Sequence, residues 1–442
     1  MKVLCIGYYD KFSRFFIGIK HELNKDFPNL EFKIKSVFFS GFFYAFIRRT
    51  PSSFLSLKAW INVLLNKKKY KYLLEESTIY KTIKLESLIN YHLKLNSKIS
   101  KTNLMLQAMS YIDILEHEFI DTKPDVVLLI GDSRLAIEVT KTLAKKNNSK
   151  IYYIEQGPFG TTVFDKKGVN ANASIKDFVI NKNEKTIDTS QQTLITSFIN
   201  RTKPEKYKRS GFYRACDYSL NLLFKSTIVF PPDLMYTDTF QFPKKYKKEA
   251  SLLEKSKTYS QPVFFLILQV PLDVNMISHS TFKTHFDILK TIKEHLPINT
   301  KLVVREHPVY KGKYEKKLYD YAKLHAIDFD TNLNVDTMLK KAAVVIVNNS
   351  TVGLEAIARY KPTVVLGDSY YANPRICITY DNNDNLSKTL KDAIRFQPDK
   401  NAIHLFLNAL FFNHLVDGFI TDKELNTAKR IAEIITKEHK TD

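Results

Sequence analysis

Short apolar runs alternate with amphipathic stretches along most of the chain. Apolar residues recur at helical spacing in 12–23, 282–296 and 314–325. Strands that alternate with such helices are typical of βαβ units around a parallel sheet, so the pattern predicts an α/β fold. The runs rich in Val, Ile and Leu, which are too short for helices and predict buried strands, are 3–7, 126–130, 151–154, 263–268, 302–304, 344–347 and 363–366.

The strands form two groups and therefore predict two Rossmann-like lobes that face a central cleft. The first lobe is expected over 1–245 and the second over 258–402. Between 181 and 257 the pattern weakens into prolines and lysine pairs, which indicates the connection between the lobes. A helical tail over 403–442 is expected to pack back across the lobes.

The first lobe contains a basic, aromatic helical insertion at about 37–120. No apolar run in the sequence reaches the ~18–20 residues that a membrane-spanning helix needs. Within 37–69, clustered Phe, Ile and Leu residues are flanked by Arg48, Arg49 and Lys67–Lys69. Such a stretch fits a helix that lies in the membrane interface, and it equally fits a buried helical hairpin with a basic rim.

Composition adds a strong positive charge and argues for a reducing compartment. The formal net charge is +21, which indicates either an anionic partner or a lysine-rich solvated surface. Nucleic acid is not predicted as a partner, because charge alone supports it and no zinc-ligand or RNA-recognition motif accompanies that charge. Three scattered cysteines and a first strand directly after Met1-Lys2 predict a cytoplasmic protein without a disulfide framework or a signal peptide.

Polar residues follow two strands of the second lobe. Arg305, His307 and Pro308 come after 302–304, and Asn349, Ser350 and Thr351 come after 344–347. Ligands of open α/β sheets bind beyond the carboxyl ends of strands, and anions favour the start of the next helix. Ser350 or Thr351 would cap that helix, and Gly353 would let backbone approach a ligand closely. We therefore expect a nucleotide-phosphate pocket.

Two carboxylates stand where a transferase would need them. Glu155 ends a strand of the first lobe and could serve as a general acid or base. Asp273 follows strand 263–268 and could act as a nucleophile at an anomeric carbon, although Asp after Pro is also a common turn residue. The dinucleotide and P-loop glycine motifs are absent, as is any metal-ligand spacing, so a transferase without metal or cofactor is predicted.

In this order the motifs resemble the bacterial capsule polysaccharide biosynthesis family of β-Kdo glycosyltransferases, over roughly 125–370. The resemblance implies a GT-B-like architecture and transfer of Kdo from CMP-Kdo with retention of the β configuration. It implies that Asp273 is the nucleophile, that Glu155 is the acid/base, and that His307 and the Ser350-Thr351 turn bind the CMP phosphate. The matching residues are Glu155, Gln156, Gly157, Asp165, Gly168, Val169, Asn170, Gln269, Asp273, Arg305, Glu306, His307, Pro308 and the run from Asn349 through Ser350, Thr351, Gly353 and Glu355 to Ala356.

Single-module members resemble the enzyme that acts on the lipid terminus of the capsule. This implies a lipid acceptor such as phosphatidylglycerol or Kdo-phosphatidylglycerol, contact with the anionic inner face of the cytoplasmic membrane, and other capsule assembly proteins as partners. Gln269, Gln156, Gly157 and Asn170 are expected to contact substrate. Two alternatives stay open: a transferase for another nucleotide sugar (a different CMP-nonulosonate, or a UDP or GDP sugar), and a non-catalytic capsule-assembly or lipid-binding protein.

Overall fold

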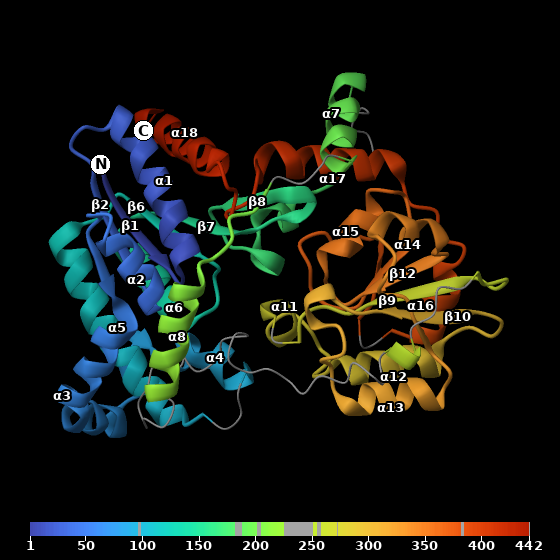
Figure 1. Cartoon of the computed structure of the whole chain (residues 1–442), viewed down its shortest axis with the longest axis horizontal. Coiled ribbons are helices and arrows are strands. Elements are labelled where there is room, and N and C mark those ends of the chain that lie inside the picture. The colour runs from blue at the N-terminus through green and yellow to red at the C-terminus, as the bar shows by residue number, and fades with distance from the viewer. Residues whose placement is uncertain are drawn as a thin grey trace. The chain divides into compact units, whose positions relative to one another are not determined.

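The computed structural model describes residues 1–95, 99–181, 188–200, 205–224, 251–253, 258–271, 273–381 and 384–441. The chain divides into two compact units (Figure 1). Unit 1 comprises Met1–Val169, Lys203–Gln241 and Leu415–Asp442, and unit 2 comprises Asn170–Thr202 and Phe242–His414. The chain thus enters unit 2 earlier than the predicted boundary near 245, and its last segment returns to unit 1.

Unit 1 is built on a seven-stranded sheet with the order β15-β8-β7-β6-β1-β2-β3. The strands from β7 to β3 run parallel, whereas β8 is antiparallel to both β7 and β15. The strands are β1 (Lys2–Gly7), β2 (Glu31–Ser36), β3 (Ser52–Phe54), β6 (Val126–Ile130), β7 (Lys150–Gln156), β8 (Thr161–Asp165) and β15 (Leu415–Asp417), with a separate hairpin of β4 (Ile79–Tyr80) and β5 (Ile83–Lys84).

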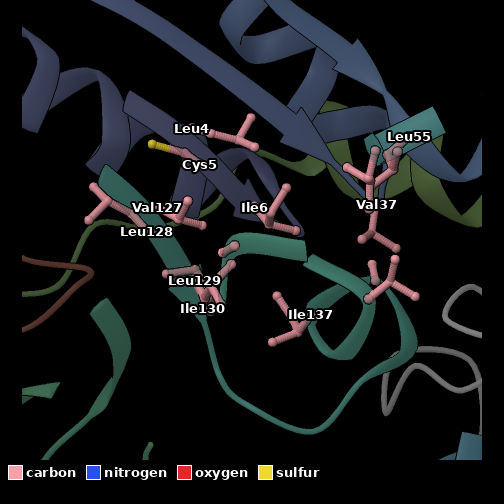
Figure 2. Close-up of a cluster of buried hydrophobic side chains, with 14 of the residues drawn as sticks. Leu4, Cys5, Ile6, Val37, Leu55, Val127, Leu128, Leu129, Ile130 and Ile137 are labelled. Carbon is pink, nitrogen blue, oxygen red and sulfur yellow. The ribbon is translucent and has the colours of Figure 1, made fainter. Parts of the chain in front are cut away.

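The helices of unit 1 cover this sheet, and the last of them, α18, packs against α1. The core lies where β1 and β6 meet their covering helices, and Figure 2 shows Leu4, Cys5 and Ile6 beside Val127–Ile130. The helices are α1 (Asp10–Asp26), α2 (Phe39–Phe46), α3 (Leu55–Glu76), α4 (Leu85–Leu95), α5 (Lys101–Thr122), α6 (Leu135–Lys146), α8 (Gly211–Phe224) and α18 (Asn426–Thr441).

Unit 2 contains a six-stranded sheet, all parallel, with the order β11-β10-β9-β12-β13-β14. Its strands are β9 (Val263–Ile267), β10 (Lys301–Arg305), β11 (Asp328–Phe329), β12 (Val344–Val347), β13 (Thr363–Val365) and β14 (Ile378–Thr379). Its helices are α7 (Thr189–Asn200), α11 (Val274–Ile277), α12 (His285–His295), α13 (Lys316–Leu324), α14 (Val335–Lys341), α15 (Thr351–Ile357), α16 (Leu386–Ala393) and α17 (Lys400–Asn413).

Both sheets start in their middle, run to one edge, and then cross back to build the other side. This is the doubly wound order of Rossmann-like folds, so the predicted class, an α/β chain with the two Rossmann-like units of a GT-B-like protein, is confirmed. The predicted strands at 126–130 and 344–347 are found with the same bounds. The predicted 403–442 tail is split, because α17 belongs to unit 2 whereas β15 and α18 belong to unit 1.

The stretch 37–69 forms α2, β3 and most of α3, and it combines features of both interpretations. Tyr44, Leu55 and Val63 are buried in unit 1. Other side chains of the same stretch, Phe46 and Leu65, are 61% and 80% exposed. Among the described residues, no helix is both long enough and apolar enough to cross a bilayer.

Candidate active site

Most of the predicted site residues of unit 2 gather where its winding reverses. The chain runs from β9 to β10 and β11, then crosses back to β12 on the other side of β9. Loops that leave β9 and β12 therefore diverge, and the crevice they leave is where open α/β sheets bind ligands. Gln269 and Asp273 follow β9, His307 follows β10, and Asn349 follows β12.

Asn349 ties the loops of this edge together. Its side chain is 5% exposed, and its Nδ2 donates to the backbone oxygens of Asn275 at 3.0 Å, His279 at 3.0 Å and Asp368 at 3.1 Å. Its Oδ1 accepts from Nδ2 of Asn348 at 3.1 Å. Buried carbonyls need donors, so this one amide fixes the loops after β9 and β13 relative to β12. Asn349 thus sets the shape of the site.

Asp273 occupies the N-cap position of α11. Its Oδ1 accepts from the backbone N–H of Asn275 at 2.9 Å, which satisfies one of the donors at the start of the helix. Nδ2 of the same Asn275 donates to Oδ1 of Asn170 at 3.1 Å. Asn170 has a φ of 53°, a left-handed conformation that Asn tolerates better than most residues. The structure thus brings two predicted site residues, Asp273 and Asn170, to the same short helix.

Gln269 is the most unusual polar group of this edge. It is 6% exposed, and neither Nε2 nor Oε1 of its side chain has a hydrogen-bond partner among the described residues. Leaving a buried amide unpaired costs about 1–3 kcal/mol for each group, so such a residue calls for an explanation. A ligand that pairs with the Gln269 amide would supply one.

Tyr314 joins the loops after β9 and β10, and the sequence analysis missed it. Its hydroxyl donates to the backbone oxygen of Gln269 at 3.0 Å and accepts from the backbone N–H of His307 at 3.0 Å. The side chain is buried, and it contacts the ring of His285 at 5.0 Å between centroids. A tyrosine before a lysine-rich helix gives no sequence signal for this role.

His307 is held as a neutral donor. Burial, followed by the charge of Arg305, lowers the pKa of its imidazole. Its Nδ1 accepts from the backbone N–H of Val309 at 3.3 Å, so in the neutral ring the proton is on Nε2. Pro308, at the first position of the following turn (Pro308–Tyr310), is exposed and fixes the local backbone. The Nε2–H of His307 is therefore suited to donate to an anionic oxygen.

Arg305 lies deeper than a ligand-binding arginine would be expected to lie. It is 7% exposed, and it donates to the backbone oxygens of Leu333 at 2.7 Å and Asp330 at 3.4 Å. Burial lowers the pKa of its guanidinium, while the charges of Asp330 and Glu355 oppose that shift. Arg305 thus fixes the loop before α14, and the half-buried Glu355 of α15 contributes to the same field.

The start of α15 is capped as predicted, but Gly353 serves packing. Ser350 is the N-cap and accepts from the backbone N–H of Val352 at 3.3 Å, and Thr351 beside it is exposed. A Cβ at Gly353 would lie 2.6 Å from the hydroxyl of Tyr371 and 2.7 Å from Cγ2 of Val347. Any side chain would therefore push α15 off β12, which is a structural reason for this glycine.

Glu155 lies at the end of β7 in unit 1. Its Oε1 accepts from the backbone N–H of Gln156 at 2.9 Å, and its Oε2 would be 3.8 Å from a Cβ placed on Gly131 in the turn after β6. Burial lowers the pKa of Lys11, at the start of α1, and the negative charge of Glu155 opposes that shift. Lys11 was not predicted as a site residue, because nothing in the sequence of 8–12 distinguishes it from an ordinary solvent-exposed lysine.

Gln156 and Gly157 form the turn between β7 and β8. Nε2 of Gln156 donates to the backbone oxygen of Thr161 at 2.6 Å, and a Cβ at Gly157 would lie 2.5 Å from Oγ1 of the same Thr161. Both residues therefore have structural roles that hold the end of β7, and with it Glu155, in place. Glu155 belongs to unit 1, whereas Asp273 and Asn170 belong to unit 2.

Further along, two carboxylates fix the chain just before it enters unit 2. Oδ1 of Asp165 accepts from the backbone N–H groups of Lys167 at 2.7 Å and Gly168 at 3.1 Å. Oδ2 of Asp132 accepts from the backbone N–H of Val169 at 3.1 Å. In the described part of the chain, no group of three or more His, Cys, Asp or Glu side chains is placed to hold a metal ion.

The protein is an α/β protein with two doubly wound units. In unit 2 a helix-capping carboxylate, an amide unpaired among the described residues and a neutral histidine follow neighbouring strands, and they define a candidate ligand site. The model of a family described as capsule polysaccharide biosynthesis protein matches residues 125–419. Because this match covers more than half of the chain, the protein belongs to that family, and the predicted family is confirmed.

The individual relatives are more distant. Protein FixF of Sinorhizobium fredii is 28% identical over 174 residues, which are 38% of this chain and 42% of FixF. Capsule polysaccharide modification protein LipB of Neisseria meningitidis serogroup B is 24% identical over 279 residues, which are 57% of this chain and 65% of LipB. The chain thus spans less than two thirds of either curated relative.

Among solved structures, similarity is found to KpsC of Thermosulfurimonas dismutans, described as a β-Kdo 2,7 transferase. The match has 15% sequence identity and a TM-score of 0.37, and it covers 72% of this chain and 89% of that one.

Proposed function

We propose that the protein is a glycosyltransferase of capsule polysaccharide biosynthesis that transfers Kdo from CMP-Kdo to a lipid acceptor with retention of the β configuration. The observation that carries the proposal is the edge of the unit 2 sheet, where Asp273, the unpaired Gln269 amide and the Nε2–H of His307 follow neighbouring strands. Membership of the capsule family and the named description of KpsC as a Kdo transferase support the choice of reaction and sugar.

In the first step a carboxylate oxygen of Asp273 attacks the anomeric carbon of Kdo. The bond between that carbon and the phosphate oxygen breaks, its electron pair stays on the phosphate, and CMP leaves. In the second step the acceptor hydroxyl attacks the same carbon, its proton passes to Glu155, and the Asp273 carboxylate is released. Two inversions at one carbon give net retention.

The surrounding residues assist this reaction by holding fixed positions. The hydrogen bond from the N–H of Asn275 orients the Asp273 carboxylate before substrate arrives. The Nε2–H of His307 donates to the phosphate as negative charge develops on the leaving CMP. The Gln269 amide binds the sugar, whose hydroxyl and carboxylate groups match an amide without a hydrogen-bond partner among the residues that the structure describes. No metal or cofactor is part of the proposal.

Replacement of Asp273 by Asn tests the mechanism without removing the helix cap. Asn caps helices about as well as Asp, so stability should change by less than ~0.5 kcal/mol. CMP release from CMP-Kdo in the presence of a short-chain phosphatidylglycerol should fall by about 10³-fold or more, because the amide cannot form the covalent intermediate. Mass spectrometry of the lipid should show one added Kdo with the unmodified protein and none with the variant.

Two outcomes would change the proposal. Full transfer by the Asp273→Asn variant would remove Asp273 from the mechanism. If CMP protects the fold but CMP-Kdo yields no CMP, then competition with other CMP, UDP and GDP sugars identifies the donor. The acceptor and the cellular location belong to the same proposal, in which the protein works on the cytoplasmic face of the membrane beside other capsule assembly proteins.

A further inference from the structure

An apolar pocket opens in unit 1, and none of the candidate active-site residues lines it. Its volume of about 690 Å³ falls within the ~300–1,000 Å³ typical of small-molecule sites. The walls come from α2, β3, α3 and α8, and Figure 1 shows α8 alongside α2 within this unit. The main lining side chains are Phe39, Phe42, Phe54, Leu57, Ile61 and Phe212.

The walls of this pocket are fixed by packing and by buried charge. Phe54 contacts the rings of Phe39 and Phe42 at centroid distances of 6.0 and 6.4 Å. The helix that closes the pocket, α8, is attached to α2 because Oδ1 of Asp217 accepts from the backbone N–H of Ser40 at 2.9 Å. Arg209 pairs with the same Asp217 and donates to the hydroxyl of Ser40 at 2.9 Å. A pocket held in this way exists before any ligand arrives.

The pocket also contains polar groups that a purely apolar ligand would leave unused. The hydroxyl of Ser53 lines it, is 5% exposed as a residue, and has no hydrogen-bond partner among the described residues. Lys58 lines the pocket as well and is exposed to solvent. An apolar cavity with an unpaired hydroxyl and an exposed ammonium matches an amphiphile that has a hydrocarbon chain and an anionic head.

The surface around the pocket suits a membrane. Ile61 and Phe212 line the pocket and are also 44% and 59% exposed. On α3, Ile61 is followed by Leu65, which is 80% exposed, and by the exposed Lys68 and Lys69. Apolar side chains flanked by lysines favour the headgroup boundary of an anionic bilayer, and a contiguous exposed apolar patch is typical of a binding surface.

We propose that this pocket binds one acyl chain of an anionic membrane amphiphile, with Lys58 at its headgroup. The inference rests on the proposed function, because it assigns the chain of the lipid acceptor to a place in unit 1. It also adds a reason for the aromatic character of 37–69, which would serve to take a lipid chain out of the bilayer.

Cysteine protection measures occupancy of the pocket directly. Cys216 lines the pocket and is half-buried, whereas Cys5 and Cys377 are fully buried, so alkylation of the folded protein reports on Cys216. Single-chain alkyl phosphates, used below their micelle-forming concentrations, should slow this alkylation. Each two added methylenes should strengthen protection by roughly tenfold until the pocket is full. Protection that is absent, or independent of chain length, would overturn the proposal.

Two pairs of variants separate the pocket from the surface. Ala215→Trp should fill the pocket from the exposed face of α8 and weaken protection by the dodecyl phosphate at least tenfold, whereas Tyr218→Trp, outside the lining on the same helix, should not. In these variants protection is read from Cys216 as before. Lys58→Gln should weaken binding of the phosphate but not of a neutral alkyl glucoside, whereas Lys68→Gln should change neither. If the two variants of either pair had the same effect on binding, the proposed lipid site would be wrong.

The same proteins distinguish failure of this inference from failure of the proposed function. Ala215→Trp should retain CMP release from CMP-Kdo with a water-soluble acceptor that has no acyl chain, and should lose transfer to the lipid. Transfer to lipid that is unaffected by Ala215→Trp would overturn the pocket but leave the transferase. Chain-length-dependent protection of Cys216 in a protein that never releases CMP would leave the pocket and overturn the transferase.

Discussion

The two units share a doubly wound strand order, but they differ in what stabilises the loops beyond their strands. In unit 2 a neutral amide, Asn349, donates to three backbone oxygens and sets the geometry around Asp273. In unit 1 a buried guanidinium, Arg209, lies between the carboxylates of Asp10 and Asp217. The same topology thus supports a set of loops tied by one amide in one unit, and a charge-clamped aromatic pocket in the other.

The comparison predicts that the charged clamp is the more sensitive to disruption. Arg209→Ala leaves Asp10, which is fully buried, and the nearly buried Asp217 without their cation. Removal of one partner of a buried ion pair costs about 3–5 kcal/mol. Urea unfolding followed by the fluorescence of Trp60, the single tryptophan and a residue of unit 1, should show this loss. Arg214→Ala, on the exposed face of α8, should leave the transition unchanged.

The neutral amide should matter less to stability and more to activity. Asn349→Ala removes the donor of three backbone oxygens that are only partly buried. Because water can partly replace the lost donor, we expect the free energy of unfolding to fall by about 2 kcal/mol, within the ~1–3 kcal/mol that a single unpaired buried group costs. Because the loop of Asp273 then loses its anchor, CMP release should fall more than tenfold while CMP still binds. A variant that loses stability but keeps its full rate would show that Asn349 has no part in positioning.

The stability of unit 2 should depend on pH through a buried histidine, His285. Burial lowers the pKa of His285 in unit 2 to about 3, against 6.5 in the unfolded chain. A depressed pKa means that the unfolded state takes up the proton first, so the contribution is full above pH 6.5 and is lost as pH falls towards 3. Between pH 7 and pH 5.5 the free energy of unfolding should decrease by about 1 kcal/mol. His285→Phe keeps a ring beside Tyr314 and should remove this part of the pH dependence measured by urea unfolding.

The smallest effect concerns the cap of α11. Asp273→Ala loses the hydrogen bond from Asn275, whereas Asp273→Asn keeps one, so the two variants should differ by about 1 kcal/mol in thermal unfolding. Both should be equally inactive. If the alanine variant were as stable as the asparagine variant, then the cap formed by Asp273 would not contribute to stability, and the position of its carboxylate would need another explanation.

Part of the fold could be predicted because some strands are uniformly apolar. Val344–Val347 and Val126–Ile130 contain only Val, Leu and Ile, and such short runs rich in β-branched residues are typical of fully buried strands. Strand β2 was not predicted, because Lys33 and Lys35 break its apolar run. Both lysines pair with Glu118 of α5, and a partner more than 80 positions away is invisible to a local pattern.

The candidate site was predictable to a similar extent. Strand ends located Asp273, His307 and Asn349, because ligand loops of parallel sheets follow their strands. The contacts that shape the site were not predictable, since Tyr314 lies in a segment without any distinctive pattern. In unit 1 the segment of Lys11, whose charge interacts with that of Glu155, is equally undistinguished. The unit boundary at Val169–Asn170 was missed for the same reason, because 170–202 carry weak periodicity.

The return of the chain to unit 1 has a consequence for synthesis on the ribosome. β15 pairs with β8, and α18 packs on α1, so unit 1 lacks an outer strand and a covering helix until the last residues emerge. Chains grow at about 5–20 residues per second. Unit 2, whose last segment ends at His414, can therefore complete its fold while unit 1 still lacks β15 and α18. During that interval β8 presents an open edge, the kind of surface that chaperones protect. Expression should therefore tolerate loss of the chain's last elements poorly.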